Sequence, residues 1–207
     1  MIVRQERLGH AKRSRLIDAA IEEFAERGVD SASYNKIIER SGLSKGTVYY
    51  YFDNKDSLLT TVLDEICDQF HQAIGDIKLP ETREGFWDIA LEYDARAVRF
   101  FLENPRLLRV LSWMFKDVPD MKEYTESVRV RMTYFIKKLI TRGQDIGAVR
   151  ADIPLETALR LRQEIGKVLA YEILEEIKPD GTGKFEEERV EKVIAAMHDL
   201  SKRILVP

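Results

Sequence analysis

Apolar residues recur at helical spacing along most of this chain. Before residue 30, spacings of three and four residues define one apolar stripe, formed by Ile17, Ala20, Ile21 and Phe24. Gly28 follows where such a helix would end. No stretch alternates apolar and polar residues as a half-buried strand does. The pattern therefore predicts an all-α protein.

Residues 33–44 carry the signals of one short helix ending and another beginning. Ser33 is a good N-cap for a helix over 34–41, because its hydroxyl can accept a backbone N–H of the first turn. Gly42 can adopt the left-handed conformation that stops this helix, and Ser44 caps the next one. Together they predict a helix-turn-helix, the motif that places its second helix in the DNA major groove.

The second of these helices has an apolar side and a polar, aromatic side. Helical spacing places Val48, Tyr51 and Phe52 inward. Gly46 permits close approach to DNA, Thr47 offers a methyl and a hydroxyl to base edges, and tyrosine hydroxyls can bond phosphates. We assign DNA binding to Ser33, Asn35, Ser44, Lys45, Gly46, Thr47, Tyr49, Tyr50 and Lys55. The alternative is that the tyrosines only fill a small core, which we accept for Tyr51 and Phe52.

A resemblance to the TetR family of bacterial transcription regulators lies in residues 42–55, which read GLSKGTVYYYFDNK. The similarity extends over about residues 14–62. Tyr34 and Asn35 stand where the family more often has a small or aliphatic residue followed by a basic one, although the Asn35 amide can still donate a hydrogen bond. The resemblance implies a double-stranded DNA operator, a C-terminal chamber for a small-molecule effector, and homodimers formed through the last two helices.

Net charge alone argues against nucleic-acid binding, because the chain carries a formal charge of −3. The charges are unevenly divided, however. Residues 1–62 have 10 Lys and Arg against 9 Asp and Glu, whereas residues 63–207 have 23 against 27. We expect two domains with this boundary, a helix-turn-helix DNA-binding domain and a larger helical domain for effector binding and dimerisation.

The first 15 residues form a basic N-terminal arm. It contains Arg4, Arg7, Lys12, Arg13 and Arg15 against the single acid Glu6. Such an arm can reach phosphates or an adjacent minor groove. The alternative is a solubilising, disordered tail, and the sequence leaves both interpretations open.

Helices are also expected throughout the rest of the chain. After a linking helix over 55–76, they are predicted over 84–103, 105–116, 120–143, 155–178 and 185–204. The last two are joined by a turn at 179–183 and form an antiparallel hairpin with more apolar residues than one internal face needs. We expect a two-fold dimer through this hairpin, because two DNA half-sites need two helix-turn-helix units. The alternative is a hairpin that packs only within its own domain.

Aromatic residues are frequent between the linking helix and this hairpin. Aromatic residues at helical spacing usually fill a core, but large rings with a few polar partners also line ligand pockets. The resemblance implies an effector chamber in this region. Candidate effector-binding residues are Trp87, Tyr93, Phe101, Trp113, Tyr134 and Gln163. Such a lining favours a hydrophobic or aromatic effector over a sugar or a phosphate.

Catalytic, metal and membrane interpretations find little support in the residues. The segment 181–184 has the glycines and lysine of a phosphate loop without its spacing, and we interpret it as a turn. Cys67 and His71 are a helical turn apart, which is weak evidence for a metal site. With one cysteine, no long apolar run and a charged N-terminus, we expect a cytoplasmic protein without cofactor, metal or membrane contact.

These observations predict a homodimeric, sequence-specific transcriptional regulator and not an enzyme. We expect a repressor that leaves a palindromic operator when a small effector binds. One alternative is a DNA-binding interaction protein controlled by a protein partner. Another is an enzyme or ligand carrier that has lost DNA binding, which the intact run from Ser44 to Lys55 argues against.

Overall fold

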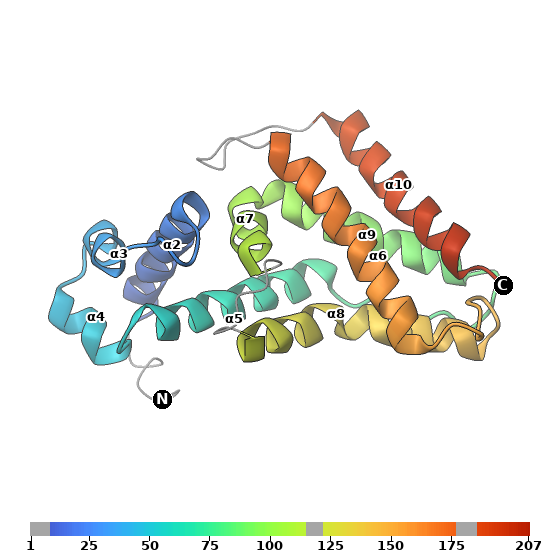
Figure 1. Cartoon of the computed structure of the whole chain (residues 1–207), viewed down its shortest axis with the longest axis horizontal. Coiled ribbons are helices and arrows are strands. Elements are labelled where there is room, and N and C mark those ends of the chain that lie inside the picture. The colour runs from blue at the N-terminus through green and yellow to red at the C-terminus, as the bar shows by residue number, and fades with distance from the viewer. Residues whose placement is uncertain (1–8, 115–121, 177–185) are drawn as a thin grey trace.

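The computed structural model describes residues 9–114, 122–176 and 186–207, which form an all-α fold (Figure 1). Its helices are α2 (His10–Arg27), α3 (Tyr34–Ser41), α4 (Lys45–Tyr51), α5 (Lys55–Ile74), α6 (Phe86–Glu103), α7 (Pro105–Met114), α8 (Lys122–Asp145), α9 (Leu155–Glu176) and α10 (Glu187–Leu205). The all-α prediction is confirmed, and helix boundaries agree to within a few residues. The predicted ends at 116 and 178, starts at 120 and 185, and turn at 179–183 lie outside the described residues.

The helix caps predicted around the helix-turn-helix are present. The Ser33 hydroxyl accepts the Lys36 N–H at 3.4 Å, and the Ser44 hydroxyl accepts the Thr47 N–H at 3.2 Å. Gly42 ends α3 in the left-handed conformation with a φ of 65°. These local signals therefore place the turn and the start of α4.

A buried carboxylate ties α2 to the beginning of α3. Glu23 is 1% exposed, and its Oε1 accepts the Ser33 N–H at 3.1 Å. Arg40, near the end of α3, places its guanidinium 3.6 Å from Glu23 and 2.7 Å from Glu26. The hydrogen bond from Arg40 holds the pKa of Glu26 below its ordinary value. Polar contacts thus fix the angle between the two helices.

Helix α5 connects the helix-turn-helix to the remaining helices without a break. Asn54 and Ser57 form a reciprocal capping box at its start. Its apolar face is buried along most of its length, with Leu58, Leu59 and Ile66 each 0% exposed. In Figure 1, α5 runs from α4 past α2 and on alongside α8. One apolar cluster extends with it from α2 into the C-terminal helices.

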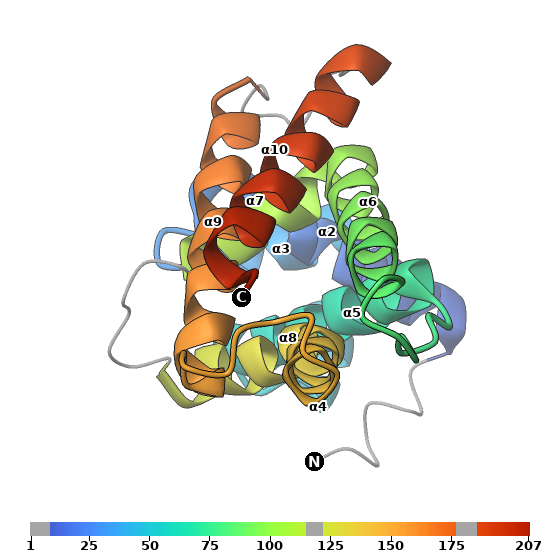
Figure 2. The ribbon, with the colours of Figure 1, turned by 90° about the vertical axis from the view of Figure 1, so that its right-hand side faces the viewer.

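The C-terminal helices enclose a second apolar cluster. Viewed end-on in Figure 2, α5 and α8 lie on one side, whereas α6, α9 and α10 lie on the other. Val98, Leu108, Ile173 and Ile194 belong to this second cluster and come from α6, α7, α9 and α10. Figure 1 shows α9 and α10 side by side and antiparallel. None of the helices in the described ranges is both long enough and apolar enough to cross a membrane.

Helix α7 contacts α2 at a glycine. Gly28 has a φ of 80° and a ψ of 160°, a conformation that is essentially confined to glycine. A Cβ at this position would lie 2.8 Å from a ring carbon of Trp113. The indole of α7 therefore packs directly on the backbone where α2 ends.

We expect Gly28→Ala to lower the free energy of unfolding by more than the roughly 1–2 kcal/mol that a left-handed alanine costs. The excess has two causes: a ψ of 160° at positive φ is essentially confined to glycine, and the methyl group also displaces the indole. Gly147→Ala is the control, since Gly147 has a φ of 69° and open space around its Cβ position. Urea unfolding measures both, and equal losses would show that neither the backbone conformation of Gly28 nor the indole contact adds to the cost.

Candidate DNA-binding surface and internal cavity

Helix α4 has the two sides that its sequence predicts. Val48 and Phe52 are 0% and 1% exposed, whereas Tyr49 and Tyr50 are 48% and 53% exposed. Tyr51 is half-buried. The prediction that the tyrosines divide between core and surface is therefore correct. Tyr49 and Tyr50 present large rings outward, next to the exposed Lys45 and Gly46 in the same helix.

Tyr34 supports this surface from α3. Its hydroxyl donates to the carbonyl oxygen of Phe52 at 2.7 Å, and its ring meets the edge of Tyr49 at a centroid distance of 5.3 Å. Burial raises the pKa of Tyr34 to about 12, so the phenol remains a donor at neutral pH. This contact gives a structural reason for a tyrosine where the sequence resemblance led us to expect a smaller residue. It orients the C-terminal part of α4 against α3.

The hydroxyl-bearing residues of the predicted DNA-binding set have different environments. Ser33 and Ser44 serve as caps, and the Ser44 and Thr47 hydroxyls lie 2.8 Å apart. Asn35 is exposed at the start of α3. A hydroxyl that caps a helix retains a lone pair or a proton for a second partner. Capping therefore leaves these groups able to contact DNA.

Lys55 has a different environment from the one we predicted. Its ammonium donates to the carbonyl oxygens of Val29, Asp30 and Ala32 at 2.7, 3.0 and 3.3 Å. All three carbonyls belong to the connection between α2 and α3. Because an ammonium has three protons, these contacts use its full donor capacity. The geometry favours a structural role for Lys55 over a phosphate contact.

The basic arm is described only in part. Arg4 and Arg7 lie outside the described residues, and Lys12 and Arg15 are exposed on α2. Arg13 is instead paired with Glu65 of α5 at 2.8 Å. The hydrogen bond from Arg13 holds the pKa of Glu65 below its ordinary value despite the opposing effect of burial. One member of the predicted arm therefore joins α2 to α5.

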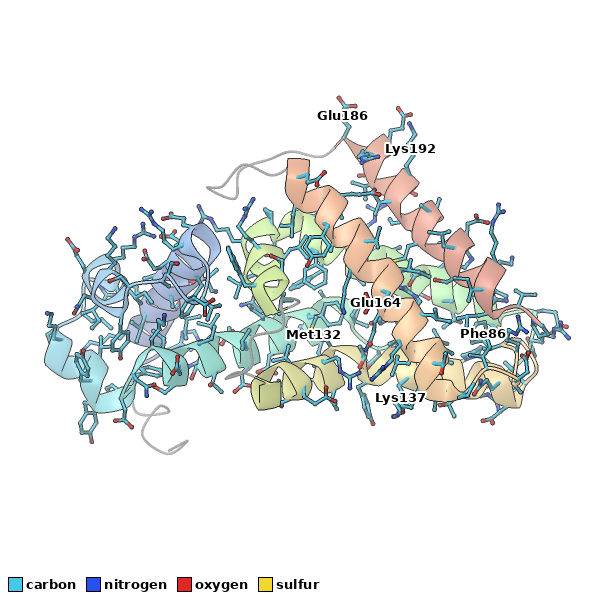
Figure 3. All side chains as sticks on the ribbon, viewed as in Figure 1. Phe86, Met132, Lys137, Glu164, Glu186 and Lys192 are labelled. Carbon is cyan, nitrogen blue, oxygen red and sulfur yellow. The ribbon has the colours of Figure 1, made fainter. Side chains whose placement is uncertain are left out.

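A cavity of about 440 Å³ lies among α5, α6, α7, α8, α9 and α10. Its apolar wall includes Phe70, Val98, Leu111, Ile136, Ile173 and Met197. Met132 of α8, labelled in Figure 3, also lines it and lies below α7 and α9 in that view. This volume and lining fall within the range of sites for small ligands.

A buried ion pair stands at the cavity wall. The Arg162 guanidinium of α9 contacts the Asp94 carboxylate of α6, and the two side chains are 9% and 2% exposed. His198 of α10 places its Nδ1 3.9 Å from the second carboxylate oxygen. Burial raises the pKa of Asp94, and the guanidinium opposes that rise. Burial also lowers the pKa of His198. Together with His198, the pair brings three helices into contact around the cavity.

The comparisons with known proteins agree with this arrangement. Residues 16–62 match the model of the family described as bacterial regulatory proteins, tetR family. The HTH-type transcriptional repressor AcnR of Corynebacterium glutamicum is 27% identical over 145 residues, covering 70% of this chain and 72% of AcnR. The chain belongs to the TetR family. It is a DNA-binding transcriptional regulator with an N-terminal helix-turn-helix, as predicted.

Solved structures of the TetR family share the fold over nearly the full length of the chain. A regulator from Shewanella sp. PV-4 superposes with a TM-score of 0.75 at 18% identity, covering 95% of this chain and 98% of that one. FadR from Bacillus subtilis, solved in complex with stearoyl-CoA, has a TM-score of 0.74 at 17% identity, covering 93% and 97%. At these identities the likeness is one of fold.

Three of the six predicted effector-binding residues line the cavity. They are Tyr93, Phe101 and Gln163. Tyr93 stacks on Phe135 with centroids 5.2 Å apart, and Phe101 stacks on Phe70 at 5.6 Å. The sequence prediction missed Arg162, whose partner Asp94 is 68 residues away along the chain.

The other three predicted effector-binding residues pack elsewhere. Trp87 meets the edges of Phe86 and His198, with centroids 4.9 and 5.7 Å away. Trp113 packs on Gly28. Tyr134 is 58% exposed, with the Lys138 ammonium 4.5 Å from its ring centroid. None of these three residues is part of the cavity wall, so their assignment to it is corrected.

The cysteine and histidine on α5 have separate surroundings. Cys67 is buried, which raises the pKa of its thiol to about 11. His71 is exposed, and its Nε2 lies 2.9 Å from the Arg131 carbonyl oxygen. Arg131 also bridges Asp64 and Asp68. Across the described residues, no three His, Cys, Asp or Glu side chains are grouped to hold a metal ion.

We expect Lys55→Met to lower the free energy of unfolding by about 1–3 kcal/mol, because three carbonyl oxygens lose a charged donor. Lys45→Met is the control, since Lys45 is exposed on the neighbouring helix. It should change stability by no more than about 0.5 kcal/mol. Thermal and urea unfolding measure both variants. Equal stability in the two would contradict the structural role of Lys55.

Proposed function

We propose that this TetR-family regulator is a homodimeric repressor that leaves a palindromic operator when a small apolar effector fills the cavity. The observation that carries this proposal is the continuity of α5, which packs under the helix-turn-helix at one end and lines the cavity with Phe70 at the other. We take residues 1–62 as the DNA-binding part, and residues 63–207 as the effector-binding and dimerising part.

The outward residues of α4 make the proposed contacts with DNA. Tyr49 and Tyr50 donate hydroxyls to phosphates, and Lys45 adds positive charge. Thr47 contacts a base edge. A side chain at residue 46 would point outward into open space, so a glycine there lets the backbone approach the groove closely. Exposure of the two rings supports this assignment, since burial would have favoured a purely structural role. Ser33, Asn35 and Ser44 are proposed to contact phosphates beside their local roles.

The proposed dimer uses an exposed apolar face of α9 and α10. On α9 the exposed fractions are 36% for Leu161, 58% for Val168 and 42% for Tyr171, and Leu200 on α10 is 44% exposed. Spacings of seven and three place the α9 residues on one side of the helix. A two-fold axis through this face would bury these side chains and bring two helix-turn-helix units together in one dimer.

Effector control follows from the two helices that touch both regions. Leu108 and Leu111 of α7 line the cavity, and Trp113 of the same helix packs on the end of α2. Helix α5 gives a second connection. A ligand that fits one arrangement of α5 and α7 better than another changes the distance between the two helix-turn-helix units of the dimer. FadR in complex with stearoyl-CoA supports a small-molecule effector with an apolar chain, and AcnR supports repression.

Control by a protein partner is the second candidate function. A solidly packed interior would favour it, because no effector would then have a site. The cavity of about 440 Å³ favours a small ligand instead.

The dimer proposal is tested by Val168→Glu. We expect this variant to raise the dimer dissociation constant at least about tenfold, because dimerisation would bury an unpaired carboxylate. DNA affinity should fall with it. Val130→Glu is the matched control, since Val130 is 53% exposed on α8 and lies outside the proposed face. Sedimentation velocity gives the mass, and retention of duplex DNA gives the affinity. If Val168→Glu has the same dimer dissociation constant as Val130→Glu, the interface lies elsewhere.

A further inference from the structure

The polar side chains of the cavity are concentrated on two of its helices. The lining side chains from α5, α6, α7 and α10 are apolar or aromatic. The polar groups that these helices bring to the cavity wall are the Tyr93 phenol and Asp94, the partner of Arg162. Helices α8 and α9 provide the polar ones, which are Glu126, Arg129, Thr133, Arg162, Gln163 and Lys167. A ligand in this cavity therefore meets an apolar interior with one polar side.

The cations on that polar side already have carboxylate partners. Arg129 donates to Glu126 through its Nε at 2.8 Å. The Lys167 ammonium lies 2.6 Å from Glu164, which Figure 3 labels on α9. Arg162 is paired with the buried Asp94. Within the part of the chain that the structure describes, each cation lining the cavity is therefore neutralised by an acid. An anionic ligand would have to compete with these acids for a cation.

Gln163 differs from these groups because its amide nitrogen lacks a partner. Its Nε2 is buried and has no hydrogen-bond acceptor among the described residues. A buried donor without an acceptor carries an uncompensated desolvation cost. Gln163 lines the cavity, so a rotation of its side chain that turns this nitrogen toward a ligand oxygen there would remove that cost. A pure hydrocarbon would leave it in place.

We propose that the effector is an uncharged, largely apolar molecule carrying a carbonyl oxygen, such as an aryl or alkyl ketone, ester or amide. Its hydrocarbon part packs between α6, α7 and α10, and its carbonyl oxygen accepts a hydrogen bond from Gln163 Nε2. A carboxylate in the same position would be buried without a cation of its own. This inference rests on the proposed function of the cavity and specifies the chemistry of its ligand.

Three naphthalenes of nearly equal shape test the inference. They are 2-acetylnaphthalene, with a neutral carbonyl, 2-ethylnaphthalene, without one, and the anion 2-naphthoate. Displacement of the fluorescent probe N-phenyl-1-naphthylamine from the full-length protein gives their dissociation constants. We expect the ketone to bind about tenfold more tightly than the hydrocarbon, the amount that one buried hydrogen bond contributes. We expect 2-naphthoate to bind more weakly than the ketone.

The variant Gln163→Met removes the donor and keeps a side chain of similar length. It should abolish the preference for the ketone and leave binding of 2-ethylnaphthalene within about twofold. Naphthoate binding as tightly as the ketone in the wild type would overturn the inference. So would a ketone preference that persists in Gln163→Met. The comparison in the wild type needs no variant, so it stands even if Gln163→Met folds poorly.

A cavity-filling variant separates failure of this inference from failure of the proposed function. Ala97→Trp places a large ring in the cavity, and Leu91→Trp is its control because Leu91 is 39% exposed on the same helix. We expect Ala97→Trp alone to lose binding of all three naphthalenes. If none of them binds the wild type, or if Ala97→Trp binds them normally, the cavity is not the ligand site and both proposals fall. If all three bind equally and Ala97→Trp removes them, only the carbonyl preference is wrong.

Discussion

Burial of the apolar face of α5 is the constraint on which the rest of the structure depends. Leu58 and Leu59 are 0% exposed under the helix-turn-helix, and Phe70, about three turns later, is part of the cavity wall. Because hydrogen bonds along an α-helix resist bending, a displacement at one end of α5 is transmitted to the other. Helix α5 therefore connects the helix-turn-helix mechanically to the cavity. Trp113 of α7, packed on Gly28, gives the connection a second point of contact.

Polar contacts within the helix-turn-helix are divided between holding the fold and remaining available to a partner. Glu23 and Tyr34 are committed to internal hydrogen bonds that hold α2, α3 and α4 together, and Lys55 ties the start of α5 to the α2–α3 connection. Tyr49 and Tyr50 expose about half of their surface. If these tyrosines contact DNA as proposed, a chain with a net charge of −3 can bind it because affinity comes from a few placed donors as well as from overall charge.

Signals that act over a few residues were readable in the sequence. Ser33, Gly42 and Ser44 predicted the caps and the turn because a cap depends only on its own first or last turn. Contacts between distant residues were not readable. Lys55 reaches carbonyls 23 to 26 residues away, and Arg162 reaches Asp94 across 68. Trp87 and Trp113 were predicted to bind the effector, but helical spacing cannot tell which of several interfaces a ring enters. Only the packed structure separates these rings from Tyr93 and Phe101 in the cavity.

The central claim is that the helix-turn-helix reads DNA under the control of the cavity. The most direct test is to sequence the duplex fragments that the purified protein retains at moderate salt, with and without a metabolite mixture. The Ala97→Trp variant is measured in parallel. The account predicts a two-fold-symmetric site that the wild type retains alone and releases with metabolites, whereas metabolites leave the DNA retention of Ala97→Trp unchanged. Retention of no specific sequence by the wild type, or equal release from both proteins, would contradict it.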